Sequence, residues 1–259
     1  MRSLEESVVT AMDGTDKKLF PFLPYIFQDI WEIGADPNVI ISLIRKELDN
    51  FPNPKVLDLG CGKGAVSIKI AQQLNCMCHG LDAVPQFIDE ANKKAREYKV
   101  NHLCKFEVAD IREAVNTLPA YDIIILGAIG TVFGDYNSTL TVLSKHLNKN
   151  GLIIMDDSYI EDNSKFVHPL IQKLETIHQQ IEASGMRLVD EVIFDKMDIK
   201  DSDDHIFSSL EKRCLELIRK YPHNKQIFEN YIEKQREENY ILENKVVSST
   251  LVIKLLNPD

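Results

Sequence analysis

The sequence predicts an α/β protein whose core is a doubly wound, mostly parallel sheet of seven strands with Rossmann-like topology. Short apolar runs alternate with longer helical patterns, which is typical of parallel strands joined by crossover helices. Residues 123–126 are apolar throughout, as expected for a strand that is covered on both faces. The 259 residues, of which 44% are hydrophobic and 27% charged, can form one elaborated domain or two small ones.

Strands and helices are expected to alternate along most of the chain. The first five strands are expected at residues 55–59, 76–81, 104–108, 121–126 and 151–155. The helices of the core are expected at residues 65–74, 85–98, 138–147 and 166–183, with a turn at 148–151. Two further strands are expected at residues 186–194 and 246–255.

Two helical additions accompany this core. The first fifty residues are predicted to be helical and split at residues 34–37, with aromatic side chains on the first piece. A late insert is predicted to begin with an acidic loop at residues 195–204 and to continue as two helices broken at Pro222. Ser208 and Glu211 have capping-box spacing for the first of these helices. We therefore divide the chain into an N-terminal helical cap (1–50), a core (51–194), a helical insert (195–244) and a last strand of the core sheet (245–259).

The charge and the apolar stretches restrict the partners and the compartment. Thirty Lys and Arg residues against forty Asp and Glu residues leave a net charge of -10, which disfavours a nucleic-acid partner. The N-terminus carries carboxylates where a signal peptide needs an apolar run. Residues 123–133, the longest apolar stretch, are far fewer than the ~20 residues that cross a bilayer. With five cysteines in no secreted-type framework, we expect a soluble, cytoplasmic protein without a membrane partner.

The most informative segment is residues 58–65, where a strand enters a glycine-rich turn that opens a helix. Gly60 and Gly62 let the backbone turn tightly and approach a ligand, and the amides of the helix N-terminus point into the same crevice. The spacing does not fit a Walker phosphate loop. It does fit the permissive dinucleotide pattern, with Asp82 at about the right distance, so a dinucleotide ligand stays open at this point.

Asp58 argues against a dinucleotide, because a carboxylate facing the crevice would repel the charges of a pyrophosphate. A ligand with cationic groups suits this position better. S-adenosylmethionine (SAM) has an ammonium and a sulfonium group and no phosphate.

The order of the motifs resembles the class I SAM-dependent methyltransferases. The pattern Asp58-x-Gly60-x-Gly62-x-Gly64 after an apolar strand is similar to the first motif of that family. Later segments resemble its second, third and fourth strands and the turn before its fifth strand, at residues 80–82, 108–111, 121–127 and 147–154. In that turn Asn150 and Leu152 replace the usual proline and second glycine, which weakens the match of the turn.

The resemblance implies a SAM site along the carboxyl edge of the sheet, with S-adenosyl-L-homocysteine (SAH) as the product. Asp82 would hold the ribose hydroxyls, Asp110 would meet the adenine amino group, and Ile111 would pack on the ring. Gly127 would lie beside the methionine portion, and Cys61 would contribute its backbone. The expected cofactor-binding residues are Asp58, Gly60, Cys61, Gly62, Gly64, Asp82, Ala83, Asp110, Ile111 and Gly127.

Two places could hold the methyl acceptor, residues 127–136 after the fourth strand and the pair Asp156 and Asp157 after the fifth. Methyl transfer from a sulfonium is a direct displacement, so the protein mainly aligns the reactants and excludes water. The two carboxylates could abstract a proton, hold a cationic acceptor, bind a divalent metal or simply cap a helix. We expect Asp156, Asp157 and Tyr136 to act in catalysis. We expect no metal, because the metal-dependent relatives want an aspartate where this chain has Gly127.

These features predict SAM-dependent methyl transfer to a small-molecule acceptor. The alternatives are a non-catalytic SAM-binding protein, an NAD(P)-binding Rossmann protein, and another SAM-type reaction such as aminopropyl transfer. The N-terminal aromatic residues are expected either to close the pocket or only to pack in the helix. The insert is expected to act as a lid or as the arm of a homodimer.

Overall fold

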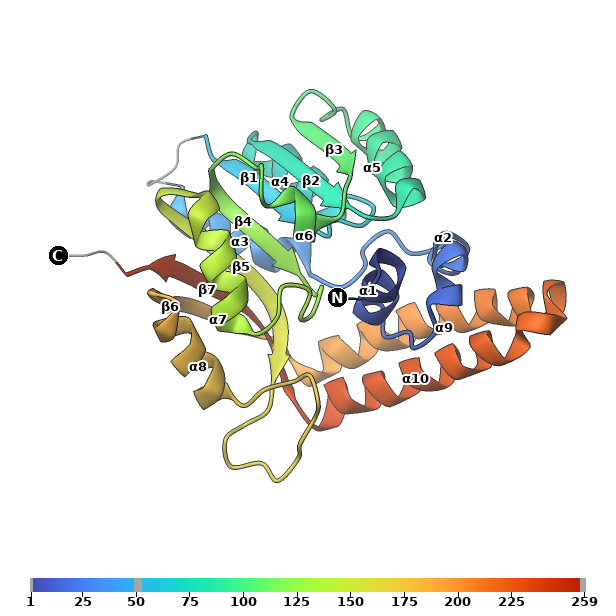
Figure 1. The fold of residues 1–259 in the computed structure, drawn as a ribbon. Helices are drawn as coiled ribbons and strands as arrows, with labels where there is room; N and C mark the ends of the chain where they lie inside the picture. Colours follow the sequence, from blue (N-terminus) through green and yellow to red (C-terminus); the bar gives the residue numbers. More distant parts are fainter. Residues whose placement is uncertain (1, 49–52, 257–259) are drawn as a thin grey trace. The chain divides into compact units, whose positions relative to one another are not determined.

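The computed structural model describes residues 2–48 and 53–256, so the predicted boundary between residues 50 and 51 lies outside the described residues. The chain forms two compact units (Figure 1). A helical unit combines Met1–Trp31 with Phe194–Ser248, and a sheet unit combines Glu32–Ile193 with Ser249–Asp259. The N-terminal segment and the late helices therefore belong to one unit, although they are far apart in the sequence.

The sheet unit is built on seven strands in the order β3-β2-β1-β4-β5-β7-β6 (Figure 1). The strands are β1 (Lys55–Leu59), β2 (Met77–Asp82), β3 (Cys104–Val108), β4 (Tyr121–Gly127), β5 (Leu147–Tyr159), β6 (Met186–Ile193) and β7 (Val247–Leu255). β1 pairs in parallel with both β2 and β4, whereas β6 runs antiparallel to β7. The predicted seven-stranded α/β fold is confirmed. Because the strand order reverses at β1, a ligand crevice is expected beyond the carboxyl ends of these central strands.

The helices of the sheet unit begin where the local sequence favours a helix start. They are α3 (Pro37–Glu47), α4 (Ala65–Leu74), α5 (Pro85–Glu97), α6 (Ile111–Ala114), α7 (Tyr136–Leu143) and α8 (Leu174–Ala183). α4 covers the residues predicted for it, since Gly64 turns the chain in a left-handed conformation just before it. α5 begins at Pro85, whose fixed φ suits the first helical position. α3 follows Asp36, whose carboxylate accepts a hydrogen bond from the Asn38 N–H at 2.7 Å.

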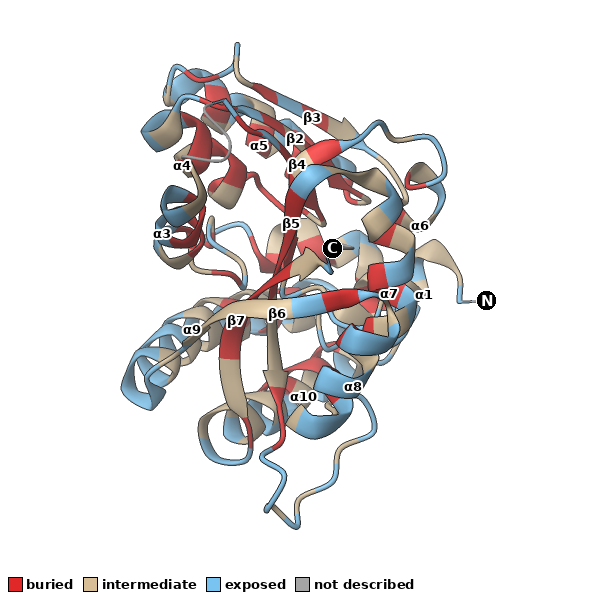
Figure 2. Ribbon diagram, turned by 90° about the vertical axis from the view of Figure 1, so that its left-hand side faces the viewer, coloured by how far each residue is buried: buried red, intermediate tan, exposed pale blue. Residues whose placement is uncertain are grey.

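The core of the sheet unit lies along its central strands. Figure 2 shows buried residues following β4 and β5. Ile123, Ile124 and Ile125 of β4 and Ile153 and Ile154 of β5 have no exposed surface. Such continuous burial requires cover on both faces of the sheet, as the apolar run in the sequence indicates. This close-packed core fixes the strand ends that carry the candidate site.

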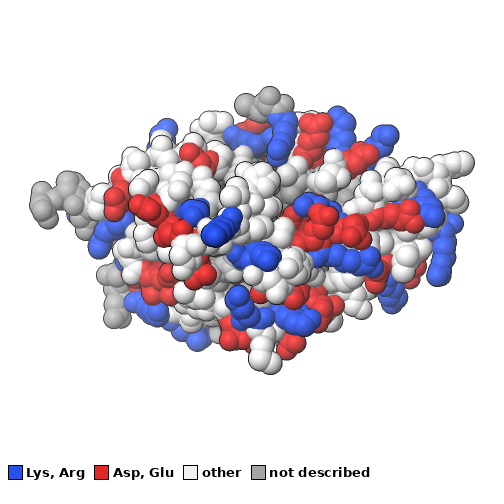
Figure 3. Space-filling model, turned by 90° about the horizontal axis from the view of Figure 1, so that it is seen from below, with Lys and Arg blue, Asp and Glu red and all other residues white. Residues whose placement is uncertain are grey.

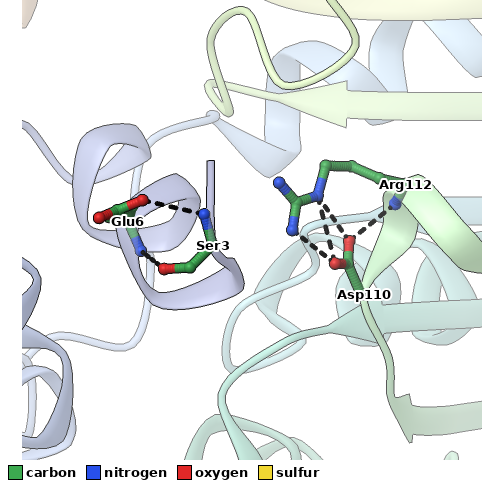
Figure 4. A network of polar contacts seen from close by, with 4 residues as sticks. All are labelled: Ser3, Glu6, Asp110 and Arg112. Carbon is green, nitrogen blue, oxygen red and sulfur yellow. Dashed lines mark hydrogen bonds and ion pairs between the residues drawn. The ribbon is translucent and has the colours of Figure 1, made fainter. Parts of the chain in front are cut away.

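The helical unit contains the helices α1 (Leu4–Ala11), α2 (Leu23–Ile26), α9 (Lys196–Lys220) and α10 (Lys225–Asn244), with 3-10 turns at Lys17–Phe22 and Pro222–Asn224. Figure 4 shows the capping box that begins α1, in which the Glu6 N–H donates to Ser3 Oγ and the Ser3 N–H donates to Glu6 Oε2. The Tyr25 hydroxyl donates to a carboxylate oxygen of Glu216 at 2.7 Å, which ties α2 to α9. The predicted break at Pro222 separates α9 from α10.

The acidic segment at residues 195–204 is helical, so the prediction of a loop there is wrong. Asp195 caps α9, because its carboxylate accepts a hydrogen bond from the Met197 N–H at 2.7 Å. Lys200 pairs with Asp204 one turn later at 2.8 Å, which supports the helix. The capping box predicted at Ser208 and Glu211 therefore falls inside α9, and these residues begin no helix.

The helix predicted at residues 166–183 begins only at Leu174, and the residues before it form a loop. Pro169 cannot donate a helical hydrogen bond, and the His168 ring accepts the backbone N–H groups of Leu170 and Ile171 instead. Lys173 Nζ holds the loop by donating to the carbonyl oxygens of two loop residues at 2.7 and 3.2 Å. Helical periodicity alone did not anticipate these side-chain-to-backbone bonds.

Two smaller differences have local causes. Residues 148–151, predicted as a turn, belong to β5, where an irregularity shifts the register against β4 between Tyr121 and Ile123. The aromatic N-terminal piece is a 3-10 turn followed by the four-residue α2, because Pro21 and Pro24 interrupt helical hydrogen bonding. Across residues 2–48 and 53–256, no helix has the length and apolar character needed to cross a bilayer.

Candidate functional site

The glycine turn that follows β1 is held against the end of β2. The N–H groups of Gly60 and Cys61 both donate to the Leu81 carbonyl, at 2.8 and 3.0 Å. Gly60, Gly62 and Gly64 all have positive φ, at +74°, +52° and +74°. Residues with side chains rarely adopt this conformation, so the turn depends on glycine at these positions.

The space around each of these glycines differs. A Cβ atom at Gly60 would lie 2.5 Å from the Ile129 side chain, and one at Gly64 would lie 2.7 Å from the Phe106 ring. At Gly62, by contrast, a Cβ atom would meet nothing within 4 Å. Gly60 and Gly64 therefore permit close packing, whereas Gly62 faces space that a ligand can use.

Two buried carboxylates flank the turn. Asp58 is 3% exposed, and one of its oxygens accepts a hydrogen bond from Ser67 Oγ at 2.6 Å. Asp82 is 7% exposed and accepts the N–H groups of Gly62 at 2.9 Å and Val84 at 2.8 Å. Desolvation raises the pKa of each carboxyl to about 6, so each is largely ionised at neutral pH. The turn thus lies between two negative charges that have little contact with water.

The third strand places Asp110 and Ile111 near the same edge. The Ala109 N–H donates to the Asp82 carbonyl at 2.9 Å, which joins the end of β3 to the end of β2. Asp110 caps α6 and is bound by the Arg112 guanidinium, with Nη2 donating at 2.6 Å and Nε at 2.9 Å (Figure 4). This guanidinium lowers the pKa of Asp110. Ile111 is buried beside it.

Gly127 ends β4 where the chain approaches residues 34–36. A Cβ atom at Gly127 would lie 3.0 Å from Ala35 Cβ, and one at Gly34 would lie 2.8 Å from Ala128 Cβ. The loop after β4 is thus covered closely by the segment that precedes α3. Cys61 is buried, and burial raises the pKa of its thiol well above the usual value, so the sulfur stays protonated.

The two aspartates at the end of β5, Asp156 and Asp157, have different neighbours. Tyr136 is buried at the start of α7, and its hydroxyl donates to Asp157 Oδ2 at 2.9 Å. Asp157 also accepts the Ser158 N–H at 2.8 Å, and desolvation raises the pKa of this carboxyl. Asp156 has its pKa raised to about 7, first by desolvation and then by the charges of Asp157 and Asp36. The structure therefore joins Tyr136 to Asp157 and places Asp156 near the start of α3.

A small pocket lies next to Asp157 within the sheet unit. Its lining residues come from the loop after β4, from α7, from the end of β5 and from the following loop. They are Gly130, Thr131, Gly134, Asp135, Tyr136, Thr139, Met155, Asp157, Ser158, Leu170 and Gln172. Asp156 is not among them.

Several residues at the site were not predicted from the sequence. Arg112 could have been noticed as a cation two residues after Asp110. Asp36 had a signal of its own, because an aspartate directly before Pro37 is typical of a helix start. Gln172 had none, since only the path of the loop at residues 161–173 brings it to the pocket. In the part of the chain that the structure describes, no three His, Cys, Asp or Glu side chains are placed to hold a metal ion.

The charged side chains of the face shown in Figure 3 are mixed, with Lys and Arg interspersed among Asp and Glu. Along the helices of the chain, residues of opposite charge form ion pairs, such as Lys234 with Glu238 at 2.6 Å in α10. A phosphate backbone is attracted by cations that gather along one track. A mixed face of this kind provides little such attraction.

Comparison with known proteins places this chain among methyltransferases. A family model described as "Methyltransferase domain" matches residues 50–243. The release factor glutamine methyltransferase of Buchnera aphidicola subsp. Baizongia pistaciae is 33% identical over 88 residues, which are 33% of this chain and 32% of that protein. The chain thus matches only about a third of the length of this relative.

Solved structures share the fold over nearly the whole chain. A SAM-dependent methyltransferase from Thiobacillus denitrificans in complex with SAH has a TM-score of 0.71 and 16% identity, and the match covers 91% of this chain and 98% of that one. The cyclopropane synthase MmaA2 from Mycobacterium tuberculosis has a TM-score of 0.73 and 13% identity, covering 98% and 99%. At these identities the likeness concerns the fold.

The matched residues include the glycine turn, both flanking carboxylates and the end of β5. The resemblance stated from the sequence motifs is therefore confirmed, and this chain belongs to the methyltransferase-domain family.

Proposed function

We propose that this protein transfers the methyl group of SAM to a small-molecule acceptor by direct displacement. The observation that carries this proposal is the glycine turn, which has open space at Gly62 and a buried carboxylate on either side, Asp58 and Asp82. When bound, SAM would supply a methyl group that its sulfonium charge has already activated. The chain's own task is then to hold the reactants in line and to exclude water.

The charge of the turn favours SAM over a dinucleotide. Both carboxyls are largely ionised at neutral pH and poorly hydrated, so they would attract an ammonium or sulfonium group and repel a pyrophosphate. An NAD(P) ligand would have to bring its negative charges to this turn. We therefore keep the NAD(P)-binding alternative only as an outcome of the test.

The acceptor capacity of Asp82 leaves room for a ribose. An ionised carboxylate has about four lone-pair sites. Two of them are engaged by the N–H groups of Gly62 and Val84, and the Ala83 backbone also bonds to this carboxylate. We assign the remaining acceptor site to one hydroxyl of the ribose. A carboxylate fixed by backbone donors is well suited to orient such a ligand.

The other cofactor contacts are assigned by position along the same edge. Asp110, held by Arg112, would accept the adenine amino group, and Ile111 would pack on the ring. Gly127 would lie beside the methionine portion, and Cys61 would contribute only its backbone because its thiol is buried and protonated. Gly60 and Gly64 would act through the shape of the turn.

On the acceptor side, we assign Tyr136, Asp156 and Asp157. Asp156, with a pKa of about 7, could take up a proton near neutral pH. Asp157 and Tyr136 form a hydrogen-bonded pair at the pocket, suited to position an acceptor. The name of the Buchnera relative indicates a protein acceptor, so a protein substrate is the second candidate.

Transfer of a labelled methyl group tests the proposal. The purified protein is incubated with methyl-labelled SAM and a panel of small acceptors, and label in the product is counted together with SAH formation. We expect labelled product and SAH to form with at least one small acceptor. Neither should form in Asp156→Asn or Asp157→Asn. SAM binding without transfer to any small molecule would support the non-catalytic protein or the protein-directed enzyme. Transfer with decarboxylated SAM alone would indicate aminopropyl transfer.

A further inference from the structure

The pocket beside Asp157 is lined by both polar and apolar residues. Asp157, Tyr136 and Gln172 lie among its polar residues, and Met155 and Leu170 lie among its apolar ones. All of them belong to the sheet unit. Leu170 is 47% exposed, so apolar surface remains available at this pocket.

Several polar residues of the pocket are hydrogen-bond acceptors, alongside the hydroxyl groups of Thr131, Thr139 and Ser158. The Asp157 carboxylate receives the Tyr136 hydroxyl and the Ser158 N–H, which occupy only part of its acceptor capacity. The Tyr136 oxygen, having donated its proton, can still accept a bond. No Lys, Arg or His is among the described residues that line the pocket, whereas Asp135 adds a second carboxylate. The pocket therefore presents negative charge without a positive partner.

Gln172 adds a further acceptor at this pocket. Its side-chain oxygen Oε1 is buried from water and has no hydrogen-bond partner in the structure. Buried polar atoms in native proteins are nearly always satisfied, so this oxygen is available to accept a hydrogen bond from a bound group. Because the unsatisfied atom is an acceptor, the group must bring a donor.

We propose that this pocket recognises the methyl acceptor by a primary ammonium group attached to an apolar body, which rests on the methyltransferase function proposed above. An ammonium group has three N–H donors, and the pocket has three acceptor groups with spare capacity, on Asp157, Tyr136 and Gln172. Met155 and Leu170 would contact the apolar body. A carboxylate or phosphate in the same place would face Asp157 and Gln172 unpaired.

Three probes that share one body test this selectivity. Phenethylammonium, 2-phenylethanol and 3-phenylpropionate differ only in carrying a cationic, neutral or anionic group. Their affinities for the full-length protein, with and without SAH, are measured by ligand-observed NMR titration at neutral pH. We expect the ammonium to bind about tenfold or more tightly than the alcohol, and the carboxylate to bind weakest. Equal affinities, tighter carboxylate binding or no binding of any probe would overturn the proposal.

Two substitutions locate the effect. Asp157→Asn keeps the shape of the side chain and an acceptor for the Ser158 N–H but removes the charge, so ammonium affinity should fall about tenfold. Gln172→Met removes the unsatisfied oxygen, so ammonium affinity should fall while the melting temperature stays or rises. Glu161→Gln is the matched control, because it removes an exposed carboxylate from the same loop and should change nothing.

A failure of the ammonium proposal can be distinguished from a failure of the proposed methyltransferase function. SAM affinity is measured by calorimetry on the same variants and should stay within about twofold, since the pocket is assigned to the acceptor. A protein that fails to bind SAM yet selects the ammonium refutes the methyltransferase assignment but leaves the pocket's preference standing. A protein that binds SAM while Asp157→Asn retains full ammonium affinity refutes the pocket.

Discussion

Asp82 is the single residue on which the proposed ribose contact depends. Replacing it with alanine removes a charge-assisted contact to the diol, which is worth on the order of 1.5–3 kcal/mol. We expect SAM affinity to fall by roughly tenfold to a hundredfold, as measured by calorimetry. Unchanged affinity in a folded variant would show that the ribose lies elsewhere.

Asp122→Ala is the matched control for this substitution. Asp122 also accepts a backbone N–H, from Lys55 at 2.8 Å, but it lies at the start of β4. That position is the opposite edge of the parallel strands. Asp122→Ala should therefore lower stability without changing SAM affinity.

The raised pKa values of Asp58 and Asp82 predict how cofactor binding depends on pH. Both carboxyls have a pKa of about 6, so they are ionised above pH 6 and become neutral as the pH falls through that value. A cationic ligand binds more tightly when these carboxylates are ionised. Its affinity should therefore be highest at neutral pH and decrease as the pH falls. Between about pH 7.5 and about pH 5.5 we expect a loss of about fourfold for each carboxylate that the ligand senses.

SAH is the matched ligand for this pH titration. It lacks the sulfonium charge, so its affinity should fall less steeply with pH than that of SAM. Calorimetric titrations of both ligands at several pH values provide the comparison. Tighter SAM binding in acid would mean that the flanking carboxylates do not face its charge.

At the residue scale, the site residues that could be predicted from the sequence are those at or directly after the end of a strand. Asp58 and Asp82 stand at fixed distances from the glycine turn, so the order of motifs was enough to select them. The pairing of Tyr136 with Asp157 joins α7 to β5, and the contact of Asp156 with Asp36 joins β5 to the start of α3. Such contacts depend on tertiary packing, which no local pattern specifies.

At the scale of the elements, the glycine turn provides the clearest test. Gly62 has φ of +52° and open space at its Cα, so alanine there costs about 1–2 kcal/mol of backbone strain without a clash. The added methyl group would occupy space assigned to the cofactor. We expect Gly62→Ala to fold, to lose that much stability and to bind SAM about tenfold or more weakly.

Gly185 provides a control with the same backbone geometry. It follows α8 and has φ of +76°, and a Cβ atom there would also meet nothing within 4 Å. Gly185→Ala should therefore lose similar stability in chemical denaturation and keep full SAM affinity. If the two variants bound SAM equally well, the space at Gly62 would not be a ligand site.

Helices and strands were predicted correctly where one local feature, such as a glycine turn or an apolar run, determines the structure. α4 follows a glycine in a left-handed conformation and spans the predicted residues, and the apolar run of β4 identified the centre of the sheet. The prediction failed where side chains compete for the backbone. Asp195 starts α9 before the predicted helix, and His168 and Lys173 hold residues 166–173 in a loop.

At the scale of the whole molecule, the cofactor should stabilise the sheet unit, because the turn and both carboxylates lie within it. At a ligand concentration of about 100 times Kd, binding adds about 2.7 kcal/mol, which corresponds to a rise in Tm of about 5–10 °C. Scanning calorimetry with and without SAH measures this. If the two units unfold separately, only the transition of the sheet unit should move.

The role of the helical unit stays a prediction, either a lid or the arm of a homodimer. Its composition from two distant segments of the chain could not be foreseen from the sequence, because contacts between residues so far apart leave no periodic pattern. Sedimentation of the full chain distinguishes a monomer from a dimer. A monomer would leave the lid as the role to be examined.

The most direct measurement is a calorimetric titration of the full-length protein with SAM, SAH and NADH at neutral pH. The central claim is that a glycine turn between two ionised, buried carboxylates accepts a nucleoside with positive charge and no phosphate. It predicts saturable binding of SAM and SAH at one site and no heat with NADH. Saturable binding of NADH, with no heat from either sulfur compound, would contradict it.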